Sequence, residues 1–175
     1  IVEFVLSSSS NGEVASESVL VEDGLAEPTF TSSQMAGEVT VTATLRDGSL
    51  PSQDALLKVY AGQPASLTLS GTSSVIPAGG EATDEMTLSL YDTFGNLANH
   101  GFYKVTLNST GGLSLLDVND EDTAMDGIQV TSPDGELHFR VLSSKEVETD
   151  TVTASLTDQP DLTASFSIEH LSGMT

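Results

Sequence analysis

The chain has 175 residues, with five Lys and Arg against 26 Asp and Glu, which gives a formal net charge of −21 at pH 7. Such an excess of negative charge repels phosphate backbones and anionic lipid surfaces, so we expect no nucleic-acid partner and no direct membrane insertion. The sequence contains no Cys, which excludes disulfides, thiolate metal sites and thiol redox chemistry.

Short runs of alternating apolar and polar residues recur from the start of the chain. Val2, Phe4 and Leu6 form one such run, and Val41–Leu45 carries another. This period of two residues is typical of half-buried strands, and no window of about 11 to 18 residues shows the 3.6-residue period of a helix. The sequence therefore predicts an all-β protein.

From Pro64 onward the alternating runs are separated by turn signals such as Pro77–Gly80 and Ser132–Gly135. Their number and spacing are typical of an immunoglobulin-like β-sandwich. The predicted strands are Ala65–Ser70, Glu85–Tyr91, Phe102–Asn108, Leu113–Val118, Ile128–Thr131, Glu136–Leu142, Thr151–Leu156 and Thr163–Glu169. The predicted inward side chains are Leu67, Leu69, Met86, Leu88, Leu90, Tyr103, Val105, Leu107, Leu137, Phe139, Val141, Val152, Ala154, Leu156, Phe166 and Ile168.

The first part of the chain repeats the second half of this pattern. At one constant offset Val41–Leu45 faces Val152–Leu156, and Asp23-Gly24 faces Asp134-Gly135. Since tandem repeats tolerate length changes in loops, a shorter offset in the first strand indicates an insertion in the second copy. That offset pairs Val2, Phe4 and Leu6 with Tyr103, Val105 and Leu107, and the insertion is the acidic segment Asp117–Gly127.

The repeat predicts the domain organisation. Residues 1–60 correspond to the C-terminal strands of an immunoglobulin-like repeat, and residues 61–170 form a complete β-sandwich. Residues 171–175 match the junction that leads from the first copy into the second. We therefore expect tandem repeats, one partial plus one complete, taken from a longer array.

Three motifs follow one another in the second copy: a small-residue and Pro start at Ala61–Leu69, an Ile-Pro-Ala-x-Gly bend in Val75–Gly80, and an Asp-x-x-Gly-Asn turn in Leu90–Ala98. Their order and spacing resemble the bacterial immunoglobulin-like repeats of the invasin and intimin type. The resemblance covers Tyr60–His170 well and Ile1–Val59 partly. It departs from the family at Leu97, where the family has Pro, and in the acidic insertion.

The resemblance implies a place for the protein. Repeats of this family form cell-surface stalks that hold an adhesive tip away from an outer-membrane anchor. For this chain it implies an extracellular, bacterial cell-surface location and neighbouring immunoglobulin-like repeats of the same protein as partners.

The sequence offers no catalytic constellation. Its three histidines, His100, His138 and His170, fall in a turn, on the outward phase of a strand and in the terminal junction, so we interpret them as exposed polar residues. No Gly-x-Ser-x-Gly elbow and no phosphate-binding Gly loop occurs. We therefore expect a protein that is not an enzyme and that binds no cofactor.

The acidic segment is the one candidate metal site, because hard cations such as Ca²⁺ favour several oxygen ligands at close spacing. It begins like an EF-hand loop but has Asp122 at the turn Gly position and Ile128 at the bidentate Glu position. The alternative interpretation is a solvated acidic loop. The calcium candidates are Asp117, Asn119, Asp120, Glu121, Asp122 and Asp126.

Three functions remain open from the sequence. The favoured hypothesis is a structural spacer in a bacterial surface adhesin-like protein. The second is an assembly module of an extracellular filament, in which another copy donates the strands that the first repeat lacks. The third is an adhesive, ligand-binding immunoglobulin-like domain that uses the loops Asp92–Gly101 and Asp117–Gly127.

Overall fold

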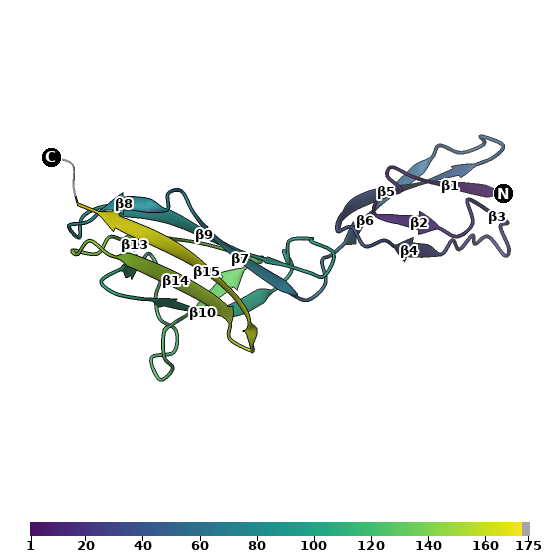
Figure 1. The fold of residues 1–175 in the computed structure, drawn as a ribbon. Coiled ribbons are helices and arrows are strands. Elements are labelled where there is room, and N and C mark those ends of the chain that lie inside the picture. Colours follow the sequence, from purple (N-terminus) through teal and green to yellow (C-terminus); the bar gives the residue numbers. More distant parts are fainter. Residues whose placement is uncertain (173–175) are drawn as a thin grey trace. The chain divides into compact units, whose positions relative to one another are not determined.

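The computed structural model describes residues 1–172, which form two compact units that divide between Ala61 and Gly62 (Figure 1). We call them unit 1 and unit 2. Every regular element in the described residues is a β-strand, as the alternating sequence pattern predicts. The prediction of an all-β protein is confirmed.

Unit 2 is a β-sandwich of two facing sheets. One sheet has the strand order β12-β10-β14-β15-β8 and the other has the order β11-β13-β9-β7. All neighbouring strands are antiparallel except β8 and β15, which run parallel. The strands are β7 (Ser66–Gly71), β8 (Val75–Pro77), β9 (Thr83–Tyr91), β10 (Phe102–Ser109), β11 (Ser114–Leu116), β12 (Ile128–Pro133), β13 (Glu136–Leu142), β14 (Thr149–Leu156) and β15 (Gln159–Leu171).

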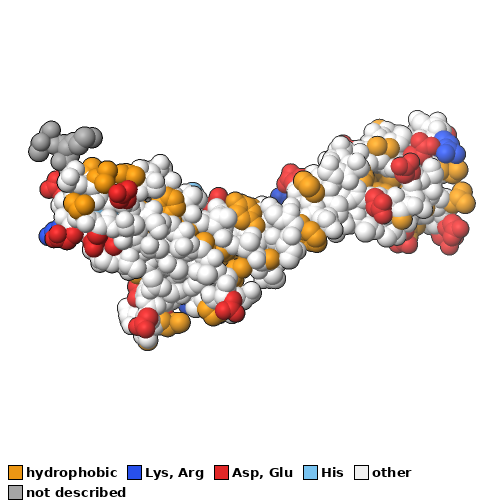
Figure 2. Space-filling view, in the orientation of Figure 1, with side chains coloured by type: hydrophobic (Ala, Val, Ile, Leu, Met, Phe, Trp, Pro, Cys, Tyr) orange, Lys and Arg blue, Asp and Glu red, His pale blue; other side chains and the backbone are white. Residues whose placement is uncertain are grey.

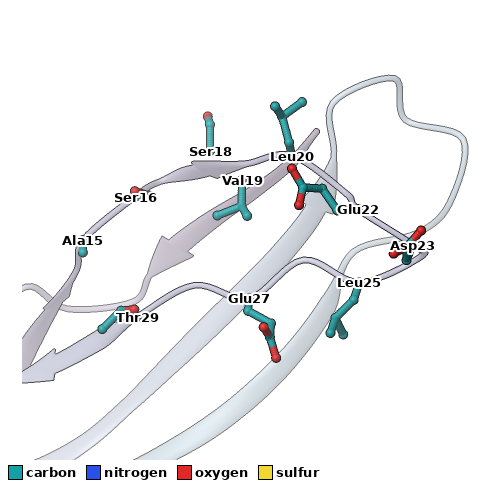
Figure 3. A pocket seen from close by; sticks show the side chains of 10 residues that line it. All are labelled: Ala15, Ser16, Ser18, Val19, Leu20, Glu22, Asp23, Leu25, Glu27 and Thr29. Carbon is teal, nitrogen blue, oxygen red and sulfur yellow. The ribbon is translucent and has the colours of Figure 1, made fainter.

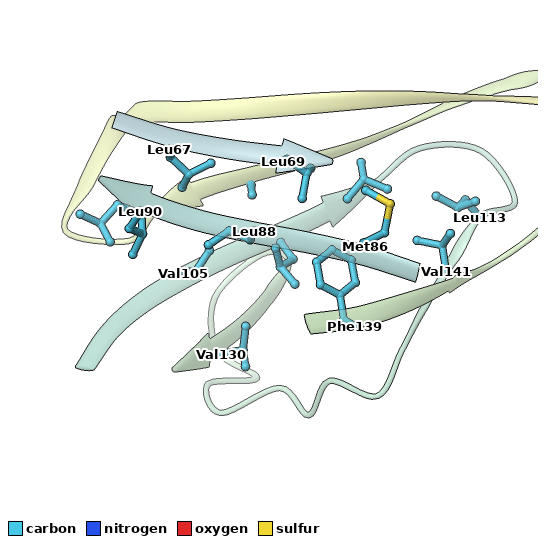
Figure 4. Packing of buried hydrophobic residues seen from close by; sticks show 14 of the residues in the cluster. Leu67, Leu69, Met86, Leu88, Leu90, Val105, Leu113, Val130, Phe139 and Val141 are labelled. Atoms are coloured by element: carbon cyan, nitrogen blue, oxygen red, sulfur yellow. The ribbon is translucent and has the colours of Figure 1, made fainter. Parts of the chain in front are cut away.

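The core of unit 2 lies between these sheets, and β9 contributes Met86, Leu88 and Leu90 to it, all essentially without exposed surface (Figure 4). The predicted inward set is confirmed, since every member is buried in this core or packs against it. Sequence reasoning missed four buried residues that lie in short strands, turns or less regular runs: Ile76, Ala98, Leu113 and Val130.

Strand β8 was not predicted, because it is short and runs directly into the Pro77 bend. It pairs with the end of β15, with Val75 opposite Glu169 and Pro77 opposite Leu171. This pairing extends β15 to Leu171, beyond the predicted strand end at Glu169. The rest of the predicted terminal junction, residues 173–175, lies outside the described residues.

Unit 1 has the same strand order as part of unit 2. Its sheets are β3-β1-β5-β6 and β2-β4, which match β12-β10-β14-β15 and β11-β13. Its strands are β1 (Val2–Leu6), β2 (Gly12–Val14), β3 (Ser18–Val19), β4 (Phe30–Ser32), β5 (Gly37–Leu45) and β6 (Gln53–Val59). The two units are therefore built on one topology.

Strand registers agree with the long repeat offset. Val41 lies opposite Ala55, just as its counterpart Val152 lies opposite Phe166. The hairpins also agree, because Asp23 and Asp134 have nearly the same positive φ, 51° and 53°. Each is followed by Gly, as a tight hairpin turn of this kind requires.

The first strand needs a different offset from the one predicted. Val2 pairs with Leu45, and Val105 pairs with Leu156, the counterpart of Leu45. Val2 therefore corresponds to Val105 rather than to Tyr103. The shift is two residues, which leaves the same face of the strand inward.

Residues 1–61 contain no strand that corresponds to β7, β8 or β9. The difference appears in burial, since Phe4 and Val39 are the buried apolar residues of unit 1. One face of its small core therefore lacks the cover that β9 and β7 provide in unit 2.

We predict that Leu88→Ala lowers the free energy of unfolding of unit 2 by about 2–5 kcal/mol, because it leaves a cavity at a fully buried position. The matched control is Leu171→Ala, at a position 45% exposed, which should cost no more than about 1 kcal/mol. Urea unfolding followed by circular dichroism measures both. Equal losses would contradict the packing described for β9.

Candidate functional site

The three histidines lie in different elements. His100 is exposed in the connection between β9 and β10, and His138 is exposed on β13, where its Nδ1 lies 3.1 Å from the hydroxyl of Thr87. The prediction that these two are exposed is confirmed. The same prediction for His170 is wrong, because His170 is completely buried.

His170 is buried because β8 extends β15 and keeps the chain in the sheet up to Leu171. Its Nε2 lies 3.3 Å from Oδ2 of Asp150, and both side chains are almost entirely inaccessible. The ring N–H is not aligned on the carboxylate, so the two groups make a close polar contact rather than a regular hydrogen bond. The other carboxylate oxygen of Asp150 accepts a hydrogen bond from the hydroxyl of Thr110 at 3.4 Å.

The sequence carried a signal for this buried pair. Asp150 shares the inward phase of β14 with Val152 and Ala154, and His170 shares that of β15 with Ile168. Residue chemistry alone indicated exposure, whereas strand periodicity indicated burial. The pair is a structural feature of the core of unit 2 near the end of β15.

The Asp-x-x-Gly-Asn motif forms a compact turn after β9, organised around the buried carboxylate of Asp92. Oδ1 accepts hydrogen bonds from the backbone amides of Phe94 (2.8 Å) and Asn96 (2.9 Å). Oδ2 accepts from the amide of Gly62 and from the side chain of Asn96, each at 2.9 Å. Gly95 supplies the positive φ of 83° that the turn requires.

These hydrogen bonds decide the charge state of Asp92. Burial acts to raise the pKa of the carboxyl, but bonds from the Asn96 side chain and from the amides of Gly62, Asn96 and Phe94 outweigh it. They favour the ionised form and lower the pKa from 3.8 to about 2. Asp92 is therefore a permanent acceptor at neutral pH and holds no proton to donate.

The Asp92 turn connects distant parts of unit 2. The Asp92 carboxylate accepts a hydrogen bond from the amide of Gly62, the first residue of the unit. Tyr91, the residue before Asp92, accepts a hydrogen bond at its carbonyl from the Ala65 amide at 2.7 Å. On the other side, the amide of Leu90 donates to the carbonyl of Gly135 in the β12–β13 hairpin at 2.8 Å. A side chain on Gly135 would come within 2.7 Å of the Ala98 carbonyl oxygen, which explains why Gly occupies this position.

The acidic segment does not gather its carboxylates around one point. Asp117 forms an ion pair with Arg140, with Oδ2 2.5 Å from Nε, and this lowers the pKa of the carboxyl. The carboxylate of Glu121 accepts from the hydroxyl and the amide of Thr131 at 2.7 and 2.9 Å, and both bonds lower its pKa.

The remaining candidates serve the backbone of the same segment. Asp120 Oδ1 accepts from the amides of Asp122 and Gln129, each at 3.1 Å, and Asp122 accepts from the Ala124 amide at 3.2 Å. Asp126 contributes its carbonyl oxygen, which accepts from the Gln129 side chain at 2.9 Å. Asn119 is exposed in the same loop.

Across residues 1–172, no three His, Asp or Glu side chains are grouped so that they could hold a metal ion. The six predicted calcium candidates share one loop, but the structure does not bring them together as a ligand set. Negative charge is instead spread over the surface, and Figure 2 shows Asp and Glu side chains scattered over both units on the face in view.

An open pocket with a volume of about 750 Å³ lies in unit 1. It follows the two chain arms that meet at the Asp23 hairpin, and Figure 3 shows Val19 pointing into the space between them. The lining combines Leu20 and Leu25 with the carboxylates of Glu22 and Glu27. In unit 2 the Leu90 amide and the Ala98 carbonyl lie against the corresponding hairpin at Gly135.

The fold is similar to that of several solved proteins. FdeC, an adhesin of Escherichia coli, has a TM-score of 0.64 and 19% identity, covering 98% of this chain and 52% of its own. Invasin, described as a bacterial integrin-binding protein, has a TM-score of 0.56 and 18% identity, covering 97% and 32%. A family 2 glycosyl hydrolase of Bacteroides cellulosilyticus has a TM-score of 0.56 and 20% identity, covering 83% and 19%.

These likenesses confirm the predicted fold, an all-β immunoglobulin-like sandwich of the type found in invasin and related adhesins. The chain spans between about a fifth and about a half of the length of these proteins. No protein-family model and no curated protein sequence matches the chain. No helix in the described part of the chain has the length and apolarity needed to cross a membrane.

We predict that Asp92→Asn lowers the melting temperature of unit 2 at neutral pH. Both carboxylate oxygens of Asp92 accept hydrogen bonds, whereas the Asn side chain has one acceptor oxygen and an NH₂ group that can only donate. A depressed carboxyl pKa gives stability that is complete above about pH 4 and is lost as the pH falls towards 2. The difference between the two proteins should therefore shrink between pH 4 and 2 in melting curves recorded by circular dichroism.

The control for this prediction is Asp134→Asn, an exposed position with the same type of substitution, where Asn also tolerates the positive φ. It should leave the melting temperature nearly unchanged. An effect of Asp92→Asn no larger than that of Asp134→Asn would show that the Asp92 turn does not depend on its carboxylate.

We predict that, after chelation, millimolar calcium and magnesium at equal ionic strength raise the melting temperature by the same amount. Both screen the net charge of −21, while the carboxylates of the acidic segment are engaged with amides, Thr131 and Arg140. Differential scanning fluorimetry measures the shift. An increase specific to calcium that Asp120→Asn abolishes would contradict this and support the calcium hypothesis.

Proposed function

We propose that this chain is a non-enzymatic spacer segment of a bacterial surface adhesin-like protein. The observation that carries the proposal is the repeated topology, in which β3-β1-β5-β6 of unit 1 recurs as β12-β10-β14-β15 of unit 2. Repeating one supersecondary unit along a chain is an economical way to build length, because each module brings its own core.

The polar features of unit 2 support a structural role. The Asp92 carboxylate is fully used by four hydrogen bonds, and it fixes the start of the unit at Gly62. Its pKa is moved away from neutrality, whereas a general acid or base functions best with a pKa near the working pH. The turn is therefore suited to holding the chain rather than to transferring protons.

The similarity to solved adhesins supports the same proposal. FdeC is an adhesin and invasin binds integrin, and this chain resembles their fold over nearly its full length. The similarity to part of a glycosyl hydrolase is a similarity of fold, since the chain corresponds to 19% of that protein. A surface location and neighbouring repeats follow from the proposal.

A second candidate function is an assembly module, in which another chain donates strands to unit 1. The observation that favours it is the free edge of β4, which pairs with β2 alone in the described residues. Unpaired strand edges are templates for strand addition. Under this hypothesis the chain would form concentration-dependent oligomers.

The spacer function predicts that the chain adds reach without adding adhesion. In a surface display protein, the chain would be inserted between an outer-membrane anchor and a peptide epitope on bacteria with long surface polysaccharide. Antibody binding to the epitope, measured by flow cytometry, should increase relative to a short flexible linker. A matched insertion carrying Leu88→Asp, which disrupts the core of unit 2, should lose most of this gain.

The same cells decide between a spacer and an adhesive module. Cells that display the chain alone should adhere to epithelial cells no more than cells that display the linker. Adherence conferred by the chain itself, and lost with a disrupted core, would contradict the spacer proposal and identify an adhesive domain.

A further inference from the structure

The core of unit 2 ends in a buried pair of ionisable side chains, Asp150 and His170. Their side chains are 2% and 0% exposed, and Oδ2 of Asp150 lies 3.3 Å from Nε2 of His170. In the described residues, neither this oxygen nor either ring nitrogen has an aligned hydrogen-bond partner. The two groups therefore compensate each other through electrostatic attraction rather than through a directed hydrogen bond.

Unit 1 has two valines at the corresponding positions. At the long repeat offset Val39 matches Asp150, and Val59 matches His170. The strand registers of the two units agree at this offset. Val39 is buried and Val59 is half-buried. The topology therefore accommodates an apolar pair at this place, and it does not require the ionisable pair of unit 2.

An ionisable pair in a core is costly unless its charges cancel. A buried ion pair is often no more stabilising than apolar residues of similar volume, whereas a single buried charge is strongly destabilising. Asp150 and His170 avoid a net charge when they hold one proton between them. With that proton on the imidazole they form an ion pair, and with it on the carboxyl both groups are neutral.

Glu148 lies beside this pair and favours retention of the proton. The His170 amide donates to the Glu148 carbonyl at 2.8 Å. The Glu148 carboxylate accepts from the Ser144 hydroxyl at 2.6 Å and from the Gly112 amide at 3.3 Å. Both bonds lower the pKa of Glu148, and a positive charge on His170 acts in the same direction. The ionised Glu148 in turn opposes loss of a proton from the pair.

The other ionisable groups at this end of unit 2 are exposed or engaged elsewhere. Asp84, on the inward phase of β9, accepts from the Thr72 hydroxyl and the Ser73 amide. The side chains of Lys145, Glu146 and Glu169 are exposed, and β8 contributes no ionisable residue. In the described residues no Lys or Arg is buried. His170 is therefore the buried side chain at this end that can carry a positive charge.

The pair lies where β8 holds the end of β15 in the sheet (Figure 1). His170 lies opposite Ile76 in this parallel pairing, which covers three residues of β8. The Ala78 amide then donates to the Leu171 carbonyl at 2.7 Å. A net charge on the pair favours contact with water, and the short β8 pairing is the part of the sheet that would open to admit it.

We propose that Asp150 and His170 form a buried proton-binding site, which holds one proton and keeps the end of β15 paired with β8 while that proton is bound. Loss of the proton in alkaline solution, or gain of a second one in acid, places a net charge in the core and loosens the pairing. The inference goes beyond the spacer function and does not depend on it, because it concerns unit 2 alone.

Proton linkage gives the sign of the pH dependence. In an unfolded chain one Asp and one His together hold two protons below about pH 4 and none above about pH 7. Above about pH 7 the folded unit therefore binds one proton more than the unfolded chain, so its stability falls as the pH rises. In acid the unfolded chain binds one proton more, so stability falls as the pH falls. The alkaline range is the cleaner one, since the chain has no Cys and its other carboxyls are ionised there.

The test is urea unfolding of the full chain between about pH 7 and about pH 9, read from the methyl NMR signals of Leu88 in the core of unit 2. Each pH unit should raise the unfolding equilibrium constant about tenfold while the folded pair keeps its proton. The matched variant carries Asp150→Val with His170→Val, the residues of unit 1, and it should lose this pH dependence. His138→Val, at an exposed histidine, should retain it.

Two further readings do not depend on urea. The imidazole ¹⁵N shifts of His170 and the carboxyl ¹³C shift of Asp150 count the protons on the pair, and the count should be one at about pH 8, where the exposed His138 is neutral. Protection of the Ala78 amide from exchange, corrected for base catalysis, should fall with rising pH in the native chain and stay constant in the double variant.

A pair that holds no proton at about pH 8 would overturn the proposal, even if the double variant does not fold. The proposal would also be overturned if the native chain and the double variant showed the same pH dependence of unfolding or of Ala78 protection.

Discussion

Burial of one face of β9 is the interaction on which the rest of the structure depends. β9 lies between β7 and β13, and its alternate side chains Met86, Leu88 and Leu90 have essentially no exposed surface. Because the hydrophobic contribution scales with the apolar area removed from water, this strand stabilises unit 2 more than any edge strand can. Unit 1 has the same topology without a counterpart of β9 in residues 1–61, and only Phe4 and Val39 are buried apolar residues there.

The Asp92 turn extends the influence of β9 to the polar parts of unit 2. A buried carboxylate is costly unless its charge is compensated by hydrogen bonds, and Asp92 receives four of them. The same contacts tie the start of the unit at Gly62 to the end of β9. The Asp-x-x-Gly-Asn motif therefore connects the end of β9 to the start of unit 2, and the charge of Asp92 contributes to stability rather than to catalysis.

Much of the fold could be predicted from alternation alone, because the period of a strand is fixed by the backbone. β13 has the predicted bounds, Glu136–Leu142, and the predicted core is confirmed. Alternation could not decide between Tyr103 and Val105 as the counterpart of Val2, since a shift of two residues preserves the pattern. It also could not reveal β8, whose parallel pairing with the end of β15 is a long-range contact.

The polar sites were less predictable, because they depend on which groups the fold brings together. His170 is buried against Asp150 although both residue types favour exposure, and only their strand phase indicated this. In the acidic segment the composition suggested calcium ligands. The Arg140 guanidinium and Thr131 fix the directions of the Asp117 and Glu121 carboxylates, and both lie in neighbouring strands that the loop sequence does not contain.

Native-state amide hydrogen exchange over the 175-residue chain tests the central claim most directly, namely that pairing with β9 is what separates the stability of the two units. The account predicts that amides of β9 and β13 exchange slowest, at the rate of global unfolding of unit 2, and that amides of β2 and β4 exchange orders of magnitude faster. Protection of β4 equal to that of β13 would contradict it.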